Sequence, residues 1–406
     1  MNICIFEDEK VKNFHPLSLS RPVYQLRCGI FSLAEKIKKC MPGSAVYYHC
    51  RLYIQPLLKL RKNTNILSAK KMNSCLFING RIIADKKLAN KLWPLKDDVI
   101  FTFKGEIIAA YITKENLKKI NLKKDWLDFK DIKAKRKNVK VTLAEYIWDL
   151  VENNETEVIN DAENNYELGK INGKIYPQVT LINKKRIFIE KNSKIKSGAV
   201  IDAEKGPVVI ERGTEILPLC TITGPVFIGK KCLIKSGAKI YPGTTIGQAS
   251  KIGGEIEESI IHEFSNKQHE GFLGHSYIGS WCNLGADTNN SDLKNNYGPV
   301  TVIMGNNKIN TRLTFVGLFM GDHSKTGINT MFNTGTVVGF SANVFGAGYL
   351  PKCIPSFAWF DAQKGPIKYK LDKAMDTAKK VMSRRQVKFT KFDNRLFNHL
   401  FSDKLQ

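Results

Sequence analysis

The stretch from residue 210 to residue 252 reads IERGTEILPLCTITGPVFIGKKCLIKSGAKIYPGTTIGQASKI and carries an isoleucine at every sixth position. A period of six differs from the 3.6-residue period of a helix and from the two-residue period of a simple strand. It is typical of hexapeptide-repeat β-helices, in which short strands stack in coils and one apolar side chain per hexad fills a central column. The stretch therefore predicts a β-helix with an isoleucine core, made by Ile210, Ile216, Ile222, Ile228, Ile234, Ile240, Ile246 and Ile252.

The same six-residue spacing extends in both directions from this stretch. It appears earlier at Ile189, Ile195 and Ile201, and it returns later at Phe272, Ile278 and Leu284, which we expect to point inward. Two segments interrupt it, Gly254–Glu270 and Asn289–Tyr297. Because a packed column leaves no room for a ligand, chemistry is expected at the corners, on these interruptions, or between adjacent subunits.

The residues before the β-helix, 1–180, have the alternation of predicted strands and helices that is typical of an α/β domain. Short apolar runs such as 3–6, 45–49 and 76–78 read as strands, and residues 32–39 and 143–151 read as helices. The polar stretch 151–180 reads as a surface linker. We therefore divide the chain into an α/β domain with its linker (1–180), a β-helix (181–360), and a C-terminal helix with a basic tail (361–406), the tail being solvated or a subunit contact.

Composition narrows the class of protein. The formal net charge is +25, which indicates either an anionic partner or a merely lysine-biased surface. Because the positive residues are dispersed and no nucleic-acid-binding motif is present, we expect no nucleic-acid partner. The chain has no secretory signal pattern and no apolar run long enough to span a membrane. Nine scattered cysteines without a C-x-x-C pair favour a reducing, cytoplasmic setting.

The first interruption is rich in histidine, the side chain best suited to proton transfer near neutral pH. His262 and His269 occur there and His275 follows closely, and the hexad register puts His269 and His275 at successive corners. Their spacing matches no common zinc pattern, so no metal site is expected. The second interruption is dense in Asn, Asp and Gly. It is either a turn-rich loop or a loop that presents amides and Lys294 to a polar ligand such as a sugar phosphate.

Residues 269–288, HEGFLGHSYIGSWCNLGADT, resemble the acetyltransferase domain of the bifunctional N-acetylglucosamine-1-phosphate uridyltransferase/glucosamine-1-phosphate acetyltransferase family. That family reads H-L-T-Y-L-G, then I-G, then N-x-G-A-G-T, with an Asn-Tyr element later. The resemblance implies an N-terminal nucleotidyltransferase-like α/β domain followed by a left-handed parallel β-helix, assembled as a homotrimer. The positions that match without a gap are His269, Gly274, Ile278, Gly279, Asn283, Gly285, Ala286 and Thr288.

The resemblance also implies site residues. His269 would be the general base for transfer of an acetyl group from acetyl-CoA to an amino-sugar phosphate. Asn283, Asn296 and Tyr297 would hold sugar and phosphate, and Lys267 would stand in for a family lysine that is missing here. The backbone amides near Gly285 and Ala286 would stabilise the tetrahedral oxyanion. Phe272 replaces the family's tyrosine, so the sugar can differ from glucosamine 1-phosphate.

The N-terminal resemblance is weaker. The family's glycine-rich phosphate loop is replaced by Glu7-Asp8-Glu9. Arg21 and Arg27 remain as basic candidates for nucleotide binding. The segment Asn79-Gly80-Arg81 stands where the family has a Gly-Asp pair that holds Mg²⁺. Either UTP and Mg²⁺ bind through different contacts, or this domain no longer transfers nucleotides.

Three functions remain open from the sequence. The first is an enzyme that acetylates an amino-sugar phosphate and also transfers a uridylyl group, giving UDP-N-acetylglucosamine for the cell envelope. The second is an enzyme with one activity, whose N-terminal domain is a non-catalytic binding domain or scaffold. The third is a non-catalytic solenoid.

Overall fold

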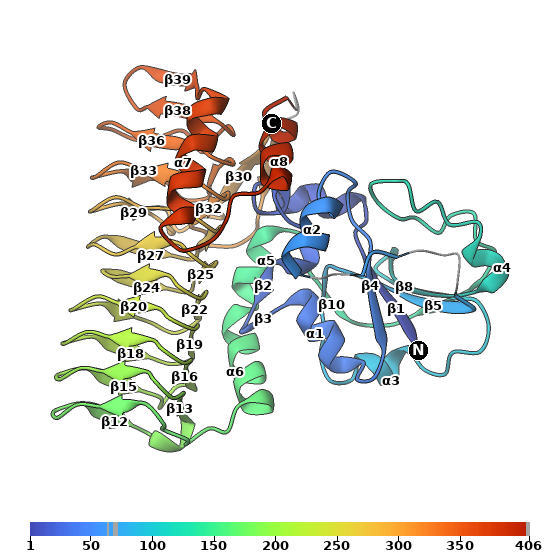
Figure 1. Ribbon diagram of the computed structural model, residues 1–406, viewed down its shortest axis with the longest axis horizontal. Helices are drawn as coiled ribbons and strands as arrows, with labels where there is room; N and C mark the ends of the chain where they lie inside the picture. Colours follow the sequence, from blue (N-terminus) through green and yellow to red (C-terminus); the bar gives the residue numbers. More distant parts are fainter. Residues whose placement is uncertain (63–64, 68–71, 403–406) are drawn as a thin grey trace.

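The computed structural model describes residues 1–62, 65–67 and 72–402 of the chain. Figure 1 shows a stack of short strands on one side, an α/β domain on the other, and helices between them. The predicted order of an α/β domain, a parallel β-helix and a C-terminal helix is confirmed.

The N-terminal domain is built on a six-stranded sheet. Its strand order is β4 (Ala45–Tyr48), β1 (Asn2–Phe6), β5 (Ser74–Asn79), β8 (Glu106–Thr113), β7 (Val99–Phe103) and β9 (Lys135–Asn138). The pairs β1–β4, β1–β5 and β7–β9 are parallel, whereas β8 is antiparallel to both neighbours. The carboxyl ends of β1, β4 and β5 therefore meet at one edge, which is where open α/β sheets bind ligands.

The remaining elements of this domain surround the sheet. The helices are α1 (Leu33–Cys40), α2 (Gln55–Lys62), α3 (Leu88–Leu92) and α4 (Lys114–Leu117). Short 3-10 turns η1 (Glu9–Phe14), η2 (Leu17–Leu19) and η3 (Val23–Gln25) follow β1, and two small pairs, β2 (Arg27–Cys28) with β3 (Phe31–Ser32) and β6 (Ile82–Ile83) with β10 (Thr142–Leu143), complete it.

The β-helix has three parallel sheets, which we call sheets I, II and III in the order in which the chain visits them. Sheet I contains β11 (Lys174–Ile175), β14 (Lys194–Ile195), β17 (Glu215–Ile216), β20 (Leu233–Ile234), β23 (Lys251–Ile252) and β26 (Asn266–Lys267). Sheet II contains β12 (Thr180–Ile182), β15 (Val200–Asp202), β18 (Thr221–Thr223), β21 (Lys239–Ile240), β24 (Glu255–Glu257) and β27 (Phe272–Gly274).

Sheet III is the longest and runs through the whole solenoid. It contains β13 (Ile187–Ile189), β16 (Val208–Ile210), β19 (Val226–Ile228), β22 (Thr244–Ile246), β25 (Ile260–Ile261), β28 (Tyr277–Ile278), β32 (Leu318–Met320), β35 (Thr336–Val338) and β37 (Cys353–Ile354). Above β27 the other two faces continue as β29 (Asn289–Asn290) with β34 (Met331–Phe332), and as β33 (Lys325–Thr326), β36 (Asn343–Phe345), β38 (Ala358–Asp361) and β39 (Gly365–Lys368).

The predicted isoleucine column is confirmed from Ile210 to Ile252, since all eight side chains are fully buried in one core. The prediction that Phe272 points inward is wrong. Leu273 pairs with Ile256 and is 1% exposed, whereas Phe272 is half-buried. The first interruption is not a loop but continues the stack through β24, β25 and β26. The inward residues Ile252, Ile256 and Ile261 are four and five positions apart, so the six-residue period breaks here. Leu273 and Ile278 are five positions apart, so the inward residue is Leu273 rather than Phe272.

The second interruption leaves the stack. Between β29 and β32 the chain makes an excursion that contains the hairpin β30 (Thr301–Met304) and β31 (Asn307–Asn310). Val300, Val302 and Val316 from this excursion pack in the same core as Trp148 and Tyr277. The excursion therefore helps to join the β-helix to the N-terminal domain.

The first half of the expected linker, up to residue 165, is helical, and its last residues already belong to the β-helix, which corrects the prediction of a surface linker over 151–180. Helix α5 (Ile147–Glu152) is followed directly by α6 (Asn154–Asn165), which runs along the β-helix between the two domains (Figure 1). Asn154 of α6 donates to the Gly243 carbonyl at 2.7 Å, and Val158 packs with Phe227. The segment thus fixes the N-terminal domain against the solenoid.

The C-terminal region contains a second helix that the sequence did not indicate. Helix α7 (Leu371–Ser383) confirms the amphipathic prediction, but residues 391–402 form α8 (Lys391–Ser402) instead of a solvated tail. Leu396 and Phe397 of α8 are buried with Phe340 of the β-helix and Leu57 of α2. Helix α8 therefore closes the gap between the domains near one end of the solenoid (Figure 1).

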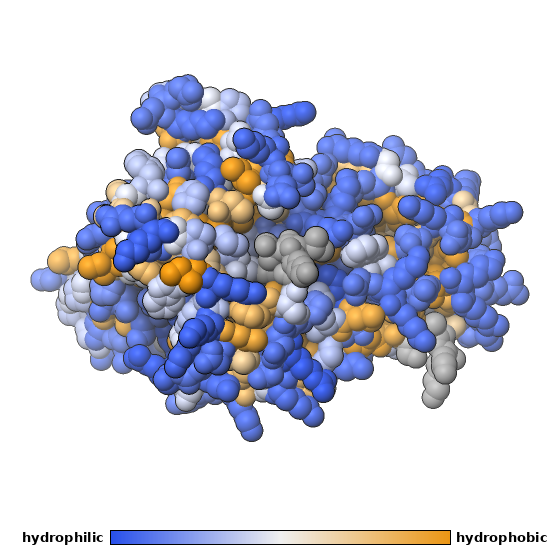
Figure 2. All heavy atoms as spheres, turned by 90° about the horizontal axis from the view of Figure 1, so that it is seen from above, coloured by the Kyte–Doolittle hydropathy of each residue, from blue (hydrophilic) through white to orange (hydrophobic). Residues whose placement is uncertain are grey.

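The surface is predominantly hydrophilic, as Figure 2 shows for the face seen from above, where apolar side chains gather only in small patches. None of the helices in the described ranges 1–62, 65–67 and 72–402 is long and apolar enough to cross a membrane.

Candidate functional site

His269 lies at the corner between β26 of sheet I and β27 of sheet II, where its side chain is exposed. The corner is shaped by its backbone contacts with the coils on both sides. The Glu255 amide below donates to the Gly271 carbonyl at 3.2 Å, and the Asp287 amide above donates to the Glu270 carbonyl at 3.1 Å. The imidazole is therefore presented to solvent from a backbone that is bonded to two other coils.

Lys267 does not point toward a substrate at this corner, contrary to the expectation. It occupies the inward position of sheet I, paired in register with Ile252, and is only 2% exposed. Its Nζ donates to the carbonyl oxygens of His269 at 2.6 Å and Glu270 at 3.1 Å. Burial lowers the pKa of Lys267 to about 8, although the carboxylates of Glu270 and Asp287 act in the opposite direction.

The depressed pKa of Lys267 makes a prediction about stability. In the unfolded chain an ordinary lysine has a pKa of about 10.4, so between about pH 8 and pH 10.4 the unfolded state binds one more proton than the folded state. The free energy of unfolding of the wild type should therefore rise over this window relative to Lys267→Ile, by up to about 3 kcal/mol. Denaturant titrations of both proteins at about pH 7 and about pH 10 measure this difference. A difference that is constant with pH would contradict it.

Asn283, Gly285 and Ala286 lie in the coil above Lys267. The Gly285 amide donates to Thr326 Oγ1 at 2.9 Å, so it is already engaged and does not offer the oxyanion contact that was expected. Ala286 uses its carbonyl to accept from the Asn329 amide. The Asn283 Oδ1 accepts from Asn266 at 3.2 Å. Asn283 therefore belongs to the outer side of sheet I, at the edge of the candidate site.

Asn296 and Tyr297 are exposed on the excursion that follows β29, and Tyr297 is 71% exposed. The Asn296 Oδ1 accepts from the Gly298 amide at 3.1 Å, and Lys294 Nζ donates to the Pro299 carbonyl. Within the described residues no hydrogen bond joins this loop to His269. The loop starts at the opposite end of the sheet II face from His269, so the two do not form one pocket within a single chain.

The next corner holds a histidine–carboxylate pair whose geometry could not be read from the sequence. His275 Nδ1 lies 2.9 Å from an Asp292 oxygen, and Phe315 stacks on the imidazole with ring centroids 5.1 Å apart. Burial lowers the pKa of His275, but the hydrogen bond and charge of Asp292 outweigh it, and the net shift is upward. His275 is thus the rival proton acceptor, on the side that faces α5 and α6.

In the N-terminal domain, the carboxyl ends of the strands are filled by the chain itself. Glu7, fully buried after β1, pairs with Arg51 at 3.1 Å and accepts from the Val23 amide at 2.7 Å. The Leu127 amide donates to the Glu7 carbonyl at 3.0 Å. Two segments, the 3-10 turns after β1 and the loop after α4, thereby cover the edge where a nucleotide would be expected.

Asn79, Gly80 and Arg81 take part in this closure. Arg81 is fully buried and pairs with Asp8 at 2.6 Å and with Glu106. Asn79 donates to Asp8 at 2.7 Å, and a Cβ on Gly80 would lie 2.9 Å from the Tyr24 ring. Their side chains are directed at their own domain, so the structure does not present them to a nucleotide.

Arg21 and Arg27, which were expected to bind a nucleotide, lie at the boundary with the β-helix. Arg21 pairs with Asp322 at 2.5 Å and also contacts His262 Nδ1 at 2.7 Å. The Arg27 amide donates to the Tyr277 hydroxyl at 2.7 Å. Burial lowers the pKa of His262 to about 4, with the charge of Arg21 acting in the same direction, so His262 is neutral and structural.

Mg²⁺ does not fit the residues at this edge. The carboxylates that could bind a hard cation, Asp8 and Glu106, already pair with Arg81, and Glu106 also pairs with Lys10. Among the described residues no group of three or more His, Cys, Asp or Glu side chains could hold a metal ion.

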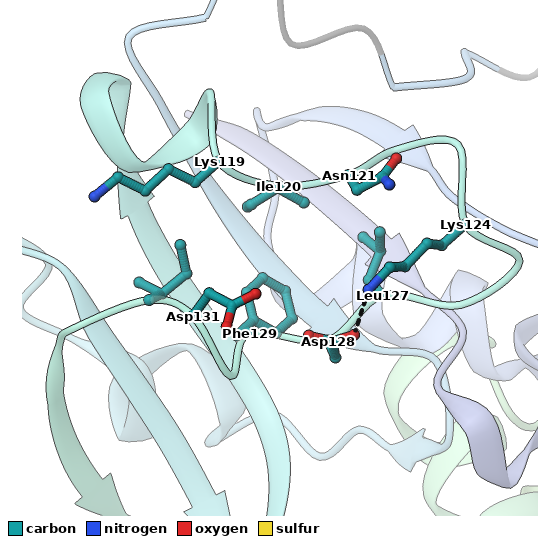
Figure 3. A pocket seen from close by; sticks show the side chains of 9 residues that line it. Lys119, Ile120, Asn121, Lys124, Leu127, Asp128, Phe129 and Asp131 are labelled. Atoms are coloured by element: carbon teal, nitrogen blue, oxygen red, sulfur yellow. Dashed lines mark hydrogen bonds and ion pairs between the residues drawn. The ribbon is translucent and has the colours of Figure 1, made fainter.

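The N-terminal domain borders two hollows. The one in Figure 3 lies in the loop after α4, has room for about 40 Å³, and is crossed by the Lys124–Asp128 ion pair at 3.1 Å. A larger one of about 450 Å³ lies between α2 and α8 and is lined by Leu52, Gln55, Pro56, Lys59, Phe392 and Arg395. Neither hollow contains the histidines or the strand ends discussed above.

Comparison with known proteins gives one family match and several partial relatives. Residues 3–167 match the family model described as sugar nucleotidyl transferase. The chain is 32% identical to the bifunctional protein GlmU of Methanococcus aeolicus over 157 residues, which is 38% of this chain and 37% of the relative. It is 33% identical to a bifunctional sugar-1-phosphate nucleotidylyltransferase/acetyltransferase of Sulfurisphaera tokodaii over 143 residues, covering 35% of this chain and 36% of the relative.

A third relative is a putative uncharacterized acetyltransferase, YaiX, of Escherichia coli, with 32% identity over 151 residues, which is 37% of this chain and 66% of the relative. Among solved structures, the UDP-N-acetylglucosamine acyltransferase of Francisella novicida is 16% identical and covers 53% of this chain and 72% of its own, with a TM-score of 0.29. A likeness this weak carries no argument about function. The matched segments span just over a third of the first two relatives.

Proposed function

We propose that the β-helix transfers an acetyl group from acetyl-CoA to the amine of an amino-sugar phosphate, with His269 as the general base. The chain is a divergent relative of the bifunctional GlmU-like nucleotidyltransferase/acetyltransferase proteins. The observation that carries the proposal is the corner between β26 and β27, which exposes His269 on a backbone bonded to the coils on either side.

The chemistry assigns a limited task to each group. The sugar amine attacks the thioester carbonyl, a C–N bond forms and the C–S bond breaks. His269 takes the proton that the nitrogen loses, and CoA leaves as the thiolate, which is protonated to the free thiol. A histidine suits this task because its ordinary pKa of about 6.5 lies close to physiological pH.

A single chain does not complete this site, because the Asn296–Tyr297 loop is separated from His269. The corner that carries His269 continues above and below as exposed apolar side chains. Leu219 and Ile328, at the same corner in other coils, are 70% and 69% exposed, and Tyr349 on the adjoining face is 74% exposed. We infer that a second copy covers this ridge in a homotrimer and contributes its Asn296 and Tyr297 to the neighbour's site.

The acceptor is proposed to be glucosamine 1-phosphate or a close analogue. The net charge of +25 favours anionic substrates in general. Because Phe272 stands in place of a tyrosine, its ring offers contact area but no hydroxyl. Both acetyl-CoA and sugar phosphates are metabolites of the cytoplasm, which is where we place this reaction.

The test uses the purified full chain with acetyl-CoA and glucosamine 1-phosphate, and it follows the release of free thiol. Glucose 1-phosphate, which lacks the amine, is the matched control. We expect thiol release only with the amino sugar, and an N-acetylated product on mass analysis. Thiol release that is equally fast with glucose 1-phosphate would show thioester hydrolysis instead, and none with any amino-sugar phosphate would refute the proposal.

For the N-terminal domain we propose a non-catalytic scaffold rather than a uridylyltransferase. The family match of residues 3–167 supports descent from a nucleotidyltransferase. The ion pairs of Glu7 with Arg51 and of Asp8 with Arg81 occupy the edge of the sheet where UTP and Mg²⁺ would bind. Turnover of UTP, with formation of UDP-N-acetylglucosamine, would require these pairs to open, and it is the alternative function.

A further inference from the structure

At the corner of His269, one inward position of the β-helix is occupied by a lysine, Lys267, whereas the inward position below it on the same sheet is occupied by Ile252. At the equivalent place in lower coils, small buried residues fill the corner between sheets I and II, namely Ala199, Cys220 and Ala238. In the coil of His269 the corresponding residue is Gly271, which has no side chain. The space at this corner is therefore available to another group.

That group is the ammonium of Lys267. A Cβ on Gly254, in the coil below, would lie 2.8 Å from Lys267 Nζ and 2.7 Å from the His269 carbonyl oxygen, so a side chain at residue 254 would displace the contact. Gly254 and Gly271 both have positive φ, 72° and 115°, which also favours glycine there. Two glycines and one inward lysine thus form a single arrangement.

An inward lysine at this position is expected to stabilise the fold less than an isoleucine would, which suggests that it is kept for another purpose. Ile234 and Ile252 occupy the two inward positions below Lys267 on sheet I, and an isoleucine would continue the column there. Burying an ammonium costs free energy unless hydrogen bonds compensate it. Here the compensation comes from the carbonyls of His269 and Glu270, at 2.6 Å and 3.1 Å.

We propose that Lys267 is a positioning residue, whose ammonium clamps the backbone of residues 269–270 from inside the β-helix and thereby sets the direction of the His269 side chain. The inference rests on the proposed acetyl transfer for its catalytic consequence. Its structural part is independent of any activity, because the clamp exists in the protein without substrate.

The key variant is Lys267→Ile, which removes the ammonium and restores an apolar column, so it separates catalysis from stability. We expect its thermal midpoint to equal or exceed that of the wild type. We expect kcat for acetyl transfer to fall at least tenfold while KM for acetyl-CoA changes by less than twofold. An effect through loss of folding would lower both the midpoint and the amount of active protein.

The matched control is Lys325→Met. Lys325 is a second lysine whose pKa is lowered by burial to about 8, and its Nζ donates to the His323 carbonyl at 2.7 Å. It resembles Lys267 in its lowered pKa and in donating to a backbone carbonyl two residues away, but it is half-buried and serves a different turn. We expect Lys325→Met to lower the thermal midpoint yet to keep kcat within about threefold of the wild type, a smaller change than the loss of a group involved in proton transfer would give.

Hydrogen exchange of the substrate-free protein tests the clamp without any assay of activity. The amides of Glu255 and Asp287 donate to the carbonyls of Gly271 and Glu270, so they report on this corner. We expect them to exchange at least tenfold faster in Lys267→Ile and at the wild-type rate in Lys325→Met. Unchanged exchange and unchanged kcat in Lys267→Ile would overturn the inference. Faster exchange in a protein that shows no acetyl transfer in any form would instead refute the proposed function and leave the clamp standing.

Discussion

Replacing His269 by alanine is expected to lower the rate of acetyl transfer by two to four orders of magnitude, which is about what loss of a general base costs. The side chain is exposed and sits on a corner whose backbone is bonded to the adjacent coils. Its removal should therefore leave the fold intact, and the thermal midpoint of His269→Ala should match that of the wild type. Release of free thiol in the presence of acetyl-CoA and the amino-sugar phosphate measures the rate.

The control for this prediction is His275→Ala, because His275 is the rival base and has the better oriented imidazole. Its contact with Asp292 at 2.9 Å and its stacking on Phe315 lie on the far side of sheet II, toward α5. We expect His275→Ala to retain a rate within about tenfold of the wild type, less than the loss of a general base would cost. A large loss in His275→Ala with none in His269→Ala would contradict the proposal and would assign the general base to His275.

The largest expected effect on stability comes from Arg21→Met. Arg21 is 8% exposed and joins the N-terminal domain to the β-helix through Asp322 at 2.5 Å and Ser280 at 2.9 Å. Its removal leaves the Asp322 carboxylate buried without a cation, which typically costs about 3–5 kcal/mol of unfolding free energy. Denaturant titration of wild type and variant measures the loss.

Two further variants serve as controls for that measurement. The double variant Arg21→Met with Asp322→Asn removes both charges, so it should recover a substantial part of the stability lost in the single variant. Lys380→Met breaks the surface pair of Lys380 with Asp376, whose side chains are 74% and 55% exposed, and it should change nothing measurable. A loss in Arg21→Met no larger than that in Lys380→Met would mean that the inter-domain pair does not hold the domains together.

The β-helix could be predicted from the sequence because its signal is local and repeated. Each isoleucine from Ile210 to Ile252 stands in the same environment as the one six residues before it, so the period records the fold directly. The register failed at Phe272 for a physical reason. Leu273 and Ile278 are five positions apart, so a period of six that includes Ile278 and Leu284 falls on Phe272 instead of Leu273.

Helix α6 and the Arg21 pair could not be predicted in this way. Helix α6 buries Asn154 and Asp161 as well as Val158 and Ala162, so its buried face is half polar and leaves no apolar period in the sequence. Asp161 is compensated by Lys36, and Asn154 by the turn at Gly243. Arg21 and Asp322 are 301 positions apart, and no pattern in one sequence reports such a pair.

In the candidate site, too, one feature could be predicted from the sequence and another could not. The exposed position of His269 at a corner followed from the hexads and from the resemblance of residues 269–288. The direction of Lys267 did not, because a lysine in the sequence indicates a solvated side chain by default. Only the register of β26 with β23, which pairs Lys267 with Ile252, shows that this lysine points inward.

A simultaneous measurement of CoA and diphosphate release by one preparation of the full chain tests whether the β-helix transfers acetyl groups while the N-terminal domain transfers no nucleotide. The reaction contains acetyl-CoA, glucosamine 1-phosphate, UTP and Mg²⁺. We expect CoA to be released with formation of the N-acetylated sugar phosphate, while diphosphate stays at the level of a control without enzyme. Diphosphate release without release of CoA would contradict it.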